Sequence, residues 1–143
     1  MATRDGTAEW RGDLKSGSGT VSVASGLFEG KYSFSTRFEE GAGTNPEELI
    51  GAAHASCFSM ALSNILAEAG HVPESVKTTA KVHLRFVDGA PTITEIDLIT
   101  EGRVPGIDQG QFADYAAQAK AGCPVSRALA SVGDITLNAT LAS

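Results

Sequence analysis

The sequence predicts an α+β domain in which strand-like segments flank one long central helix. Short segments near both ends alternate apolar with polar or small residues, which is the period of a half-buried strand. Residues 46–69 are instead apolar or small on nearly every helical face. No repeat, linker or low-complexity tract interrupts the 143 residues, so we expect a single domain over residues 1–143.

The N-terminal third predicts an antiparallel sheet with one solvent-exposed face. Three β-prone segments are separated by glycine-rich turns, namely Thr7–Trp10, Thr20–Ser25 and Lys31–Phe38. In the third segment, aromatic residues and a threonine recur at every second position, as expected of a strand. The short break between Gly26 and Gly30 predicts a hairpin between the second and third segments.

A long helix is predicted to follow. Asn45 is a favourable N-cap, Pro46 suits the first helical position, and Glu48 stands three residues after the cap. Gly70 is a natural end. The helix would be roughly 35 Å long. Because it lacks a polar face, we expect it to be buried centrally.

The second half predicts another hairpin, two helices and a last strand. The hairpin arms are Val76–Phe86 and Ile93–Thr100, joined by a turn at residues 88–91. Asp108 is expected to cap a helix that ends near Lys120. A short helix from Pro124 to about Val132 and an alternating strand from Ile135 to Leu141 complete the chain.

Charge and hydropathy exclude several classes of partner. The net charge is −6 and the basic residues are scattered, so nucleic acid is not an expected partner. The first ten residues contain no apolar stretch of a signal peptide. The longest apolar-rich segment, Leu49–Leu66, is interrupted by histidine, serine and asparagine, which disfavours a membrane span. We therefore expect a cytoplasmic protein, where redox-active thiols are more common than structural disulfides.

The two cysteines occupy settings that favour thiol chemistry. Cys57 lies on the long helix, one turn after His54. Cys123 precedes Pro124, so it would stand at a helix N-terminus, where free N–H groups favour a thiolate. Three alternatives are core packing, a structural disulfide, and a metal site built on His54 and Cys57. The metal site lacks further ligands in the sequence, so we expect neither a metal nor a cofactor.

Four stretches of the chain, in order, carry a resemblance to a known family. They are Phe34-Ser-Thr-Arg-Phe-Glu39, the run from Gly43 to Leu62 that contains Ala-His-Ala-Ser-Cys-Phe, Val104-Pro-Gly-Ile-Asp108, and Lys120-Ala-Gly-Cys-Pro-Val-Ser126. These stretches resemble the osmotically inducible protein C (OsmC) type of the OsmC and organic hydroperoxide reductase family.

The resemblance implies a fold, an assembly and a reaction. It implies an intertwined homodimer of α+β subunits that reduces organic hydroperoxides without metal, haem or flavin. The cysteine matching Cys57 attacks the peroxide, and the one matching Cys123 resolves the sulfenic acid as a disulfide that a dithiol reductant then reduces. Arg37 and Glu47 match an assisting pair, with Arg11 as a substitute for Arg37.

The residues alone leave other functions open. Cys57 could serve a cysteine hydrolase or acyltransferase activated by His54, although no third orienting residue is evident. A non-enzymatic module that binds apolar ligands is the other alternative. Ile50, Phe58, Met60 and Leu62 on the long helix would favour a bulky apolar substrate over hydrogen peroxide.

The positions of Glu47 and Cys57 raise a question about assembly. On a straight helix they would lie about 15 Å apart along the axis, too far for direct contact. Either the helix breaks near Gly51, or a second subunit supplies Arg37 and Glu47. A helix without a polar face needs more cover than one small subunit provides, so we expect the second arrangement.

Overall fold

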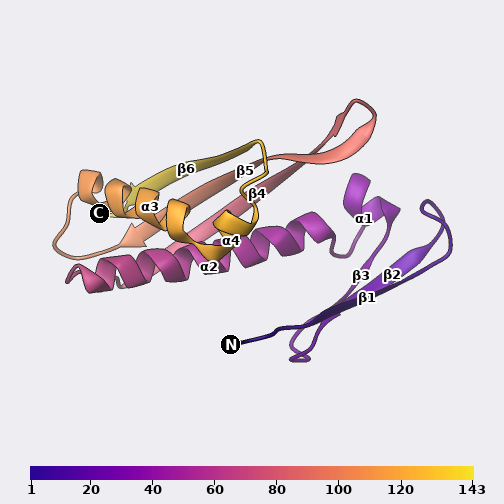
Figure 1. Ribbon diagram of the computed structural model, residues 1–143, viewed down its shortest axis with the longest axis horizontal. Coiled ribbons are helices and arrows are strands. Elements are labelled where there is room, and N and C mark those ends of the chain that lie inside the picture. Colours follow the sequence, from indigo (N-terminus) through magenta and orange to yellow (C-terminus); the bar gives the residue numbers. More distant parts are fainter. The chain divides into compact units, whose positions relative to one another are not determined.

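The computed structural model describes residues 1–143, which form two compact units, Met1–Leu49 and Ile50–Ser143. The boundary between the units falls within the long helix α2, Pro46–Glu68 (Figure 1). Both units combine helices with a three-stranded sheet, which confirms the α+β prediction. The single domain over residues 1–143 stays a prediction.

The first unit contains an antiparallel sheet in the order β1-β2-β3, with strands Gly6–Arg11, Ser18–Val23 and Glu29–Tyr32. The predicted hairpin between the second and third strands is confirmed. Trp10 and Tyr32 flank Gly19 of the central strand, and their ring centroids lie 5.4 Å apart. A Cβ atom at Gly19 would meet the Tyr32 ring at 2.5 Å, so this ring pair requires glycine.

The strand predicted to reach Phe38 ends at Tyr32, and that part of the prediction is wrong. Residues Phe34–Phe38 form a short helix, α1, in which Arg37 occupies the last turn. Ser33 caps this helix, because its hydroxyl accepts from the Thr36 N–H while the Thr36 hydroxyl accepts from the Ser33 N–H. Phe34 and Phe38 then stack one helical turn apart, with centroids separated by 4.9 Å.

The second unit contains the sheet β4-β5-β6, with strands Ser75–Val87, Ala90–Arg103 and Asp134–Leu141. The first two form the predicted hairpin, and Asp88 and Gly89 have positive φ angles of 50° and 79° at its tight turn. Strand β6 pairs with β5 in parallel, an arrangement that the alternation of residues did not predict. A parallel pair needs a long crossover, which α3, Gln109–Gly122, and α4, Pro124–Ala128, supply (Figure 1).

The helix caps follow the sequence closely. Asp108 caps α3 and shares a capping box with Gln111, as predicted for its start. Asn45 accepts from the Glu48 N–H at the start of α2, which confirms the predicted N-cap. The Glu48 carboxylate does not complete the box, since it accepts instead from the Thr44 hydroxyl at 2.7 Å.

Helix α2 buries one face within the second unit. The buried side chains recur every four residues, at His54, Phe58, Leu62 and Leu66. The last three belong to the core cluster that includes residues of α3 and the sheet. Gly51 permits a close approach, because a Cβ atom there would lie 3.0 Å from the Ala80 carbonyl oxygen. The other face is exposed in a single chain, with Met60 at 75%.

By length and composition, α2 is the one helix that could cross a membrane, with a mean hydropathy of 1.4 over its most apolar window. Its buried apolar side chains, Phe58, Leu62 and Leu66, belong to the core of the second unit. The helix is continuous from Pro46 to Glu68, so the alternative of a break near Gly51 is wrong.

Candidate active site

Cys123 lies where two helices of the second unit meet. It is the C-cap of α3 and the N-cap of α4, and Pro124 is the first residue of α4, as predicted. Helix α4 ends at Ala128, four residues before the predicted end at Val132. Cys123 itself is completely buried.

The two thiols are in contact although they come from different helices. The Sγ atoms of Cys57 and Cys123 lie 3.0 Å apart, and both cysteines are free. A disulfide bond is about 2.05 Å long, so the sulfurs need to approach by about 1 Å to form one. Cys57 is only partly buried, whereas Cys123 is inaccessible to solvent.

The surroundings of the thiols favour a negative charge on Cys123. Burial raises the pKa of the Cys57 thiol above its ordinary value, and its hydrogen bond with Cys123 raises that pKa further. Burial acts in the same direction on Cys123. Hydrogen bonds from Cys57, from the N–H groups of Ser126 and Val125, and from the Ser126 hydroxyl outweigh it, so the pKa of Cys123 is lowered.

A buried histidine continues this network. The Nε2 atom of His54 lies 2.7 Å from Oγ of Ser126, and neither side chain is appreciably exposed. Burial lowers the pKa of His54 below its ordinary value of 6.5, so the ring is neutral at pH 7. Its Nδ1 atom is buried without a hydrogen-bond partner.

The unpartnered Nδ1 atom indicates the direction of the hydrogen bonds. A neutral imidazole has one N–H and one acceptor nitrogen, and a buried N–H without a partner is the rarer arrangement. With the proton on Nε2, His54 donates to Ser126 and the Ser126 hydroxyl is free to donate to Cys123. Ser126 was missed in the sequence, because only the approach of α4 to α2 gives it this role.

In the first unit, Arg37 and Glu47 form the ion pair in which both were predicted to take part. Nη2 of Arg37 lies 2.7 Å from Oε1 of Glu47, and Nε donates to both carboxylate oxygens at 3.1 and 3.2 Å. The Glu47 side chain is 8% exposed and that of Arg37 is 37% exposed. Glu47 thus occupies one edge of the guanidinium and leaves Nη1 for another acceptor.

The predicted substitute for Arg37 takes no part in this pair. Arg11 bonds Glu9 at 2.7 Å on the exposed edge of β1. Asn45 links the two helices that carry the pair. Its side chain donates to the Thr36 carbonyl of α1 at 2.9 Å and so joins the start of α2 to α1.

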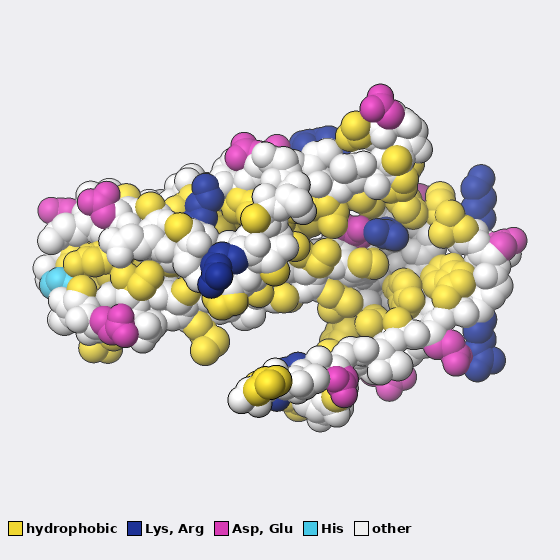
Figure 2. All heavy atoms as spheres, viewed as in Figure 1, with side chains coloured by type: hydrophobic (Ala, Val, Ile, Leu, Met, Phe, Trp, Pro, Cys, Tyr) yellow, Lys and Arg dark blue, Asp and Glu magenta, His cyan; other side chains and the backbone are white.

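An aromatic hollow of about 440 Å³ opens beside Arg37 in the first unit. Its lining is largely apolar and comes from β1, the following turn, β3 and α1, namely Trp10, Gly12, Leu14, Tyr32, Ser33, Phe34, Arg37 and Phe38. Figure 2 shows hydrophobic side chains gathered on the surface of this unit. Of the α2 side chains expected to favour an apolar substrate, Phe58 and Leu62 are fully buried core residues and do not line this hollow.

The fold and these groups define a class of protein, an α+β protein with a contacting dithiol and a separate, partly buried Arg–Glu pair. The family described as OsmC-like protein matches residues 39–138, and the chain belongs to that family.

The individual relatives agree with this assignment. The chain is 55% identical to the Escherichia coli protein named peroxiredoxin OsmC, over 98% of this chain and 97% of that protein. It is 31% identical to an organic hydroperoxide resistance protein of Xanthomonas axonopodis, over 68% and 67% of the two chains. The fold matches a Legionella pneumophila organic hydroperoxide resistance protein with a TM-score of 0.75 at 24% identity, over 98% and 99% of the chains.

Proposed function

We propose that the protein is a cysteine-based peroxidase that reduces organic hydroperoxides to alcohols. The observation that carries the proposal is the 3.0 Å contact between the sulfur atoms of Cys57 and Cys123. Cys57 is partly exposed, whereas Cys123 is completely buried. The 55% identity to a protein named peroxiredoxin OsmC supports the same reaction.

In the first step, the Cys57 thiolate attacks the terminal peroxide oxygen. The O–O bond breaks, Cys57 becomes a sulfenic acid, and the alkoxide leaves as the alcohol after taking one proton. In the second step, the Cys123 thiolate attacks the sulfenic sulfur and forms the disulfide, and the S–O bond breaks to expel hydroxide, which leaves as water after taking one proton. A dithiol reductant then restores both thiols by exchange and is itself oxidised to a disulfide.

The buried network favours the second step. Because the Ser126 hydroxyl and two backbone N–H groups lower the pKa of Cys123, that sulfur is ready to attack as soon as Cys57 is oxidised. His54 holds Ser126 at 2.7 Å and is therefore a positioning residue for the resolving thiol.

The first step requires a cation beside Cys57, because burial and its neighbour both raise the pKa of that thiol. We assign this role to Arg37, oriented by Glu47, with Nη1 free to meet the thiolate or the peroxide. In the proposed homodimer, the partner subunit covers the exposed face of α2 and brings its Arg37 and Glu47 to this chain's Cys57.

The aromatic hollow beside Arg37 supports an apolar substrate. A carbon chain or ring could occupy it while the peroxide oxygens meet the guanidinium. The same hollow is the one observation that favours the alternative of a non-enzymatic module for apolar ligands. The hydrolase alternative loses support, since Nε2 of His54 pairs with Ser126 and Nδ1, its basic nitrogen, makes no hydrogen bond to the Cys57 thiol.

We further propose that the protein acts in the cytoplasm, that its peroxidase reaction uses no metal or organic cofactor, and that it has no nucleic-acid or membrane partner. The experiment that tests the function follows the loss of cumene hydroperoxide under steady-state conditions with a panel of dithiols and monothiols. Peroxidase chemistry predicts continuous turnover with at least one dithiol. A binding module would consume no peroxide with any of them.

A further inference from the structure

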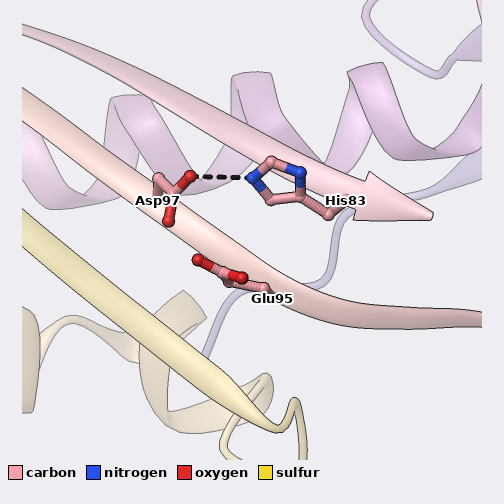
Figure 3. A group of neighbouring side chains, drawn as sticks. All are labelled: His83, Glu95 and Asp97. Carbon is pink, nitrogen blue, oxygen red and sulfur yellow. Dashed lines mark hydrogen bonds and ion pairs between the residues drawn. The ribbon is translucent and has the colours of Figure 1, made fainter. Parts of the chain in front are cut away.

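On the second unit, three side chains with metal-ligating atoms gather on the sheet face that points away from the helices. They are His83 of β4 and Glu95 and Asp97 of β5 (Figure 3). Ile96 and Leu98, which alternate with the two acidic residues, face the core and are fully buried. His83 is the direct ladder partner of Glu95, so two adjacent strands hold the three groups.

Asp97 is held in place from two sides. Its Oδ2 atom lies 2.7 Å from Nε2 of His83, and its Oδ1 atom accepts from the Thr136 hydroxyl of β6 at 2.7 Å. The Asp97 carboxylate therefore points at the imidazole nitrogen and is fixed by the Thr136 hydroxyl on its other side.

Glu95 lies beside this pair with little to balance its charge. Its nearest cation is Arg85, whose Nη1 atom is 3.6 Å away and already donates to the Thr94 hydroxyl at 2.8 Å. Both partners are substantially exposed, and such surface pairs are weak. Lys81, the ladder partner of Asp97, is exposed as well. Two carboxylates and one imidazole thus share a small space that lacks a strong cation.

We propose that His83, Glu95 and Asp97 bind one divalent transition-metal ion. Their ligand atoms all lie within 4.8 Å of one another, and one nitrogen with two carboxylate oxygens is a donor set suited to zinc, cobalt or manganese. The ion would take the place of the proton between His83 and Asp97.

The geometry requires a small adjustment. With bonds of about 2.0–2.1 Å in a tetrahedral arrangement, two donor atoms stand about 3.4 Å apart. The His83 and Asp97 atoms would therefore separate by about 0.7 Å, which the partly exposed His83 side chain can supply by rotating. Thr136 would orient the Asp97 ligand, the role that hydrogen-bonding partners commonly have around metals.

This site is distinct from the thiols. Cys57 and Cys123 belong to the core between the helices and the inner face of the sheet, whereas the three ligands stand on its outer face. The ion would join β4 to β5 and, through Thr136, to β6. We expect it to stabilise the sheet rather than to take part in peroxide reduction.

The test measures zinc binding by titration calorimetry on the full chain after treatment with a chelator. It uses a Cys57→Ser/Cys123→Ser background, so that thiolates cannot bind the metal. We expect one zinc ion per chain. His83→Ala and Asp97→Asn should each weaken binding by more than about 100-fold, and Thr136→Val should weaken it by about tenfold.

Two control variants distinguish binding of zinc by the three ligands from non-specific binding to other carboxylates or imidazoles. Glu101→Gln removes a carboxylate from the same strand, and His71→Ala removes another imidazole, so both should leave the affinity unchanged. Cobalt should in addition give a visible absorption band that His83→Ala abolishes. Absence of saturable binding would overturn the proposal, as would equal weakening by Asp97→Asn and Glu101→Gln.

Discussion

The sulfur atoms of Cys57 and Cys123 are 3.0 Å apart, yet the two cysteines differ in solvent exposure and in thiol pKa. Cys57 is partly exposed, whereas Cys123 is buried and has the lowered pKa. For attack on a bulky peroxide, access of the substrate to the thiol matters more than a low thiol pKa, because a thiolate without solvent exposure cannot meet the substrate. We therefore assign the attack to Cys57 and the resolution to Cys123.

The two cysteine variants should behave differently. Cys57→Ser should consume no peroxide, whereas Cys123→Ser should consume about one equivalent and then stop with Cys57 oxidised. Loss of peroxide in a single turnover, measured on reduced protein without a dithiol, distinguishes them. A single turnover that survives in Cys57→Ser but not in Cys123→Ser would reverse the two roles.

The aromatic hollow should make the enzyme selective. We expect kcat/KM for cumene hydroperoxide to exceed that for hydrogen peroxide by at least about tenfold, which corresponds to roughly 1.4 kcal/mol. Leu14→Ala should reduce this preference, because Leu14 lines the hollow. Leu27→Ala is the matched control, since Leu27 is 91% exposed and lies outside the hollow. Equal kcat/KM values for both peroxides would contradict an apolar substrate site.

The pKa of Cys123 should depend on Ser126. In a Cys57→Ser background, Ser126→Ala removes a hydrogen bond to the thiolate, so the pKa of Cys123 should rise. Ultraviolet absorbance of the thiolate, followed as a function of pH, measures the change. Ser59→Ala removes a comparable hydroxyl that bonds Thr78 instead, and it should leave the titration unchanged. A pKa unaffected by Ser126→Ala would remove Ser126 and His54 from the resolving step.

Much of the fold was predictable because its signals are local. Asn45, Asp108 and Pro124 mark helix starts in the sequence, and each stands where a helix begins in the structure. Helix α1 was missed because over five residues the alternation of Phe34 and Phe38 fits a strand as well as a helical turn. Ser33 followed by Thr36 was the overlooked cap signal.

The site was less predictable from residues alone. The contact between Cys57 and Cys123 and the bond between His54 and Ser126 both depend on the packing of α2 against the junction of α3 and α4. No spacing in the sequence encodes that packing. The settings of Cys57 and Cys123 already indicated thiol chemistry, whereas the roles of Arg37 and Glu47 came from the family resemblance. All four roles remain predictions.

Exchange of subunits should reveal which chain supplies Arg37. Inactive Cys57→Ser and inactive Arg37→Ala proteins are mixed under conditions that allow exchange. If the arginine acts across the dimer, the intact Cys57 of the Arg37→Ala chain meets the partner's Arg37 and activity returns. Replacing the first protein by the double variant Cys57→Ser/Arg37→Ala should give no activity. Verified exchange without recovery would place the four residues in one chain.

Peroxide should oxidise Cys57 and Cys123 to a disulfide within one chain. This is tested by intact mass spectrometry of the reduced protein after one equivalent of cumene hydroperoxide. We expect a loss of about two mass units per chain, with peptide mapping that joins Cys57 to Cys123, because forming the bond removes two hydrogen atoms. An unchanged mass, or one added oxygen that persists on the wild-type chain, would contradict it.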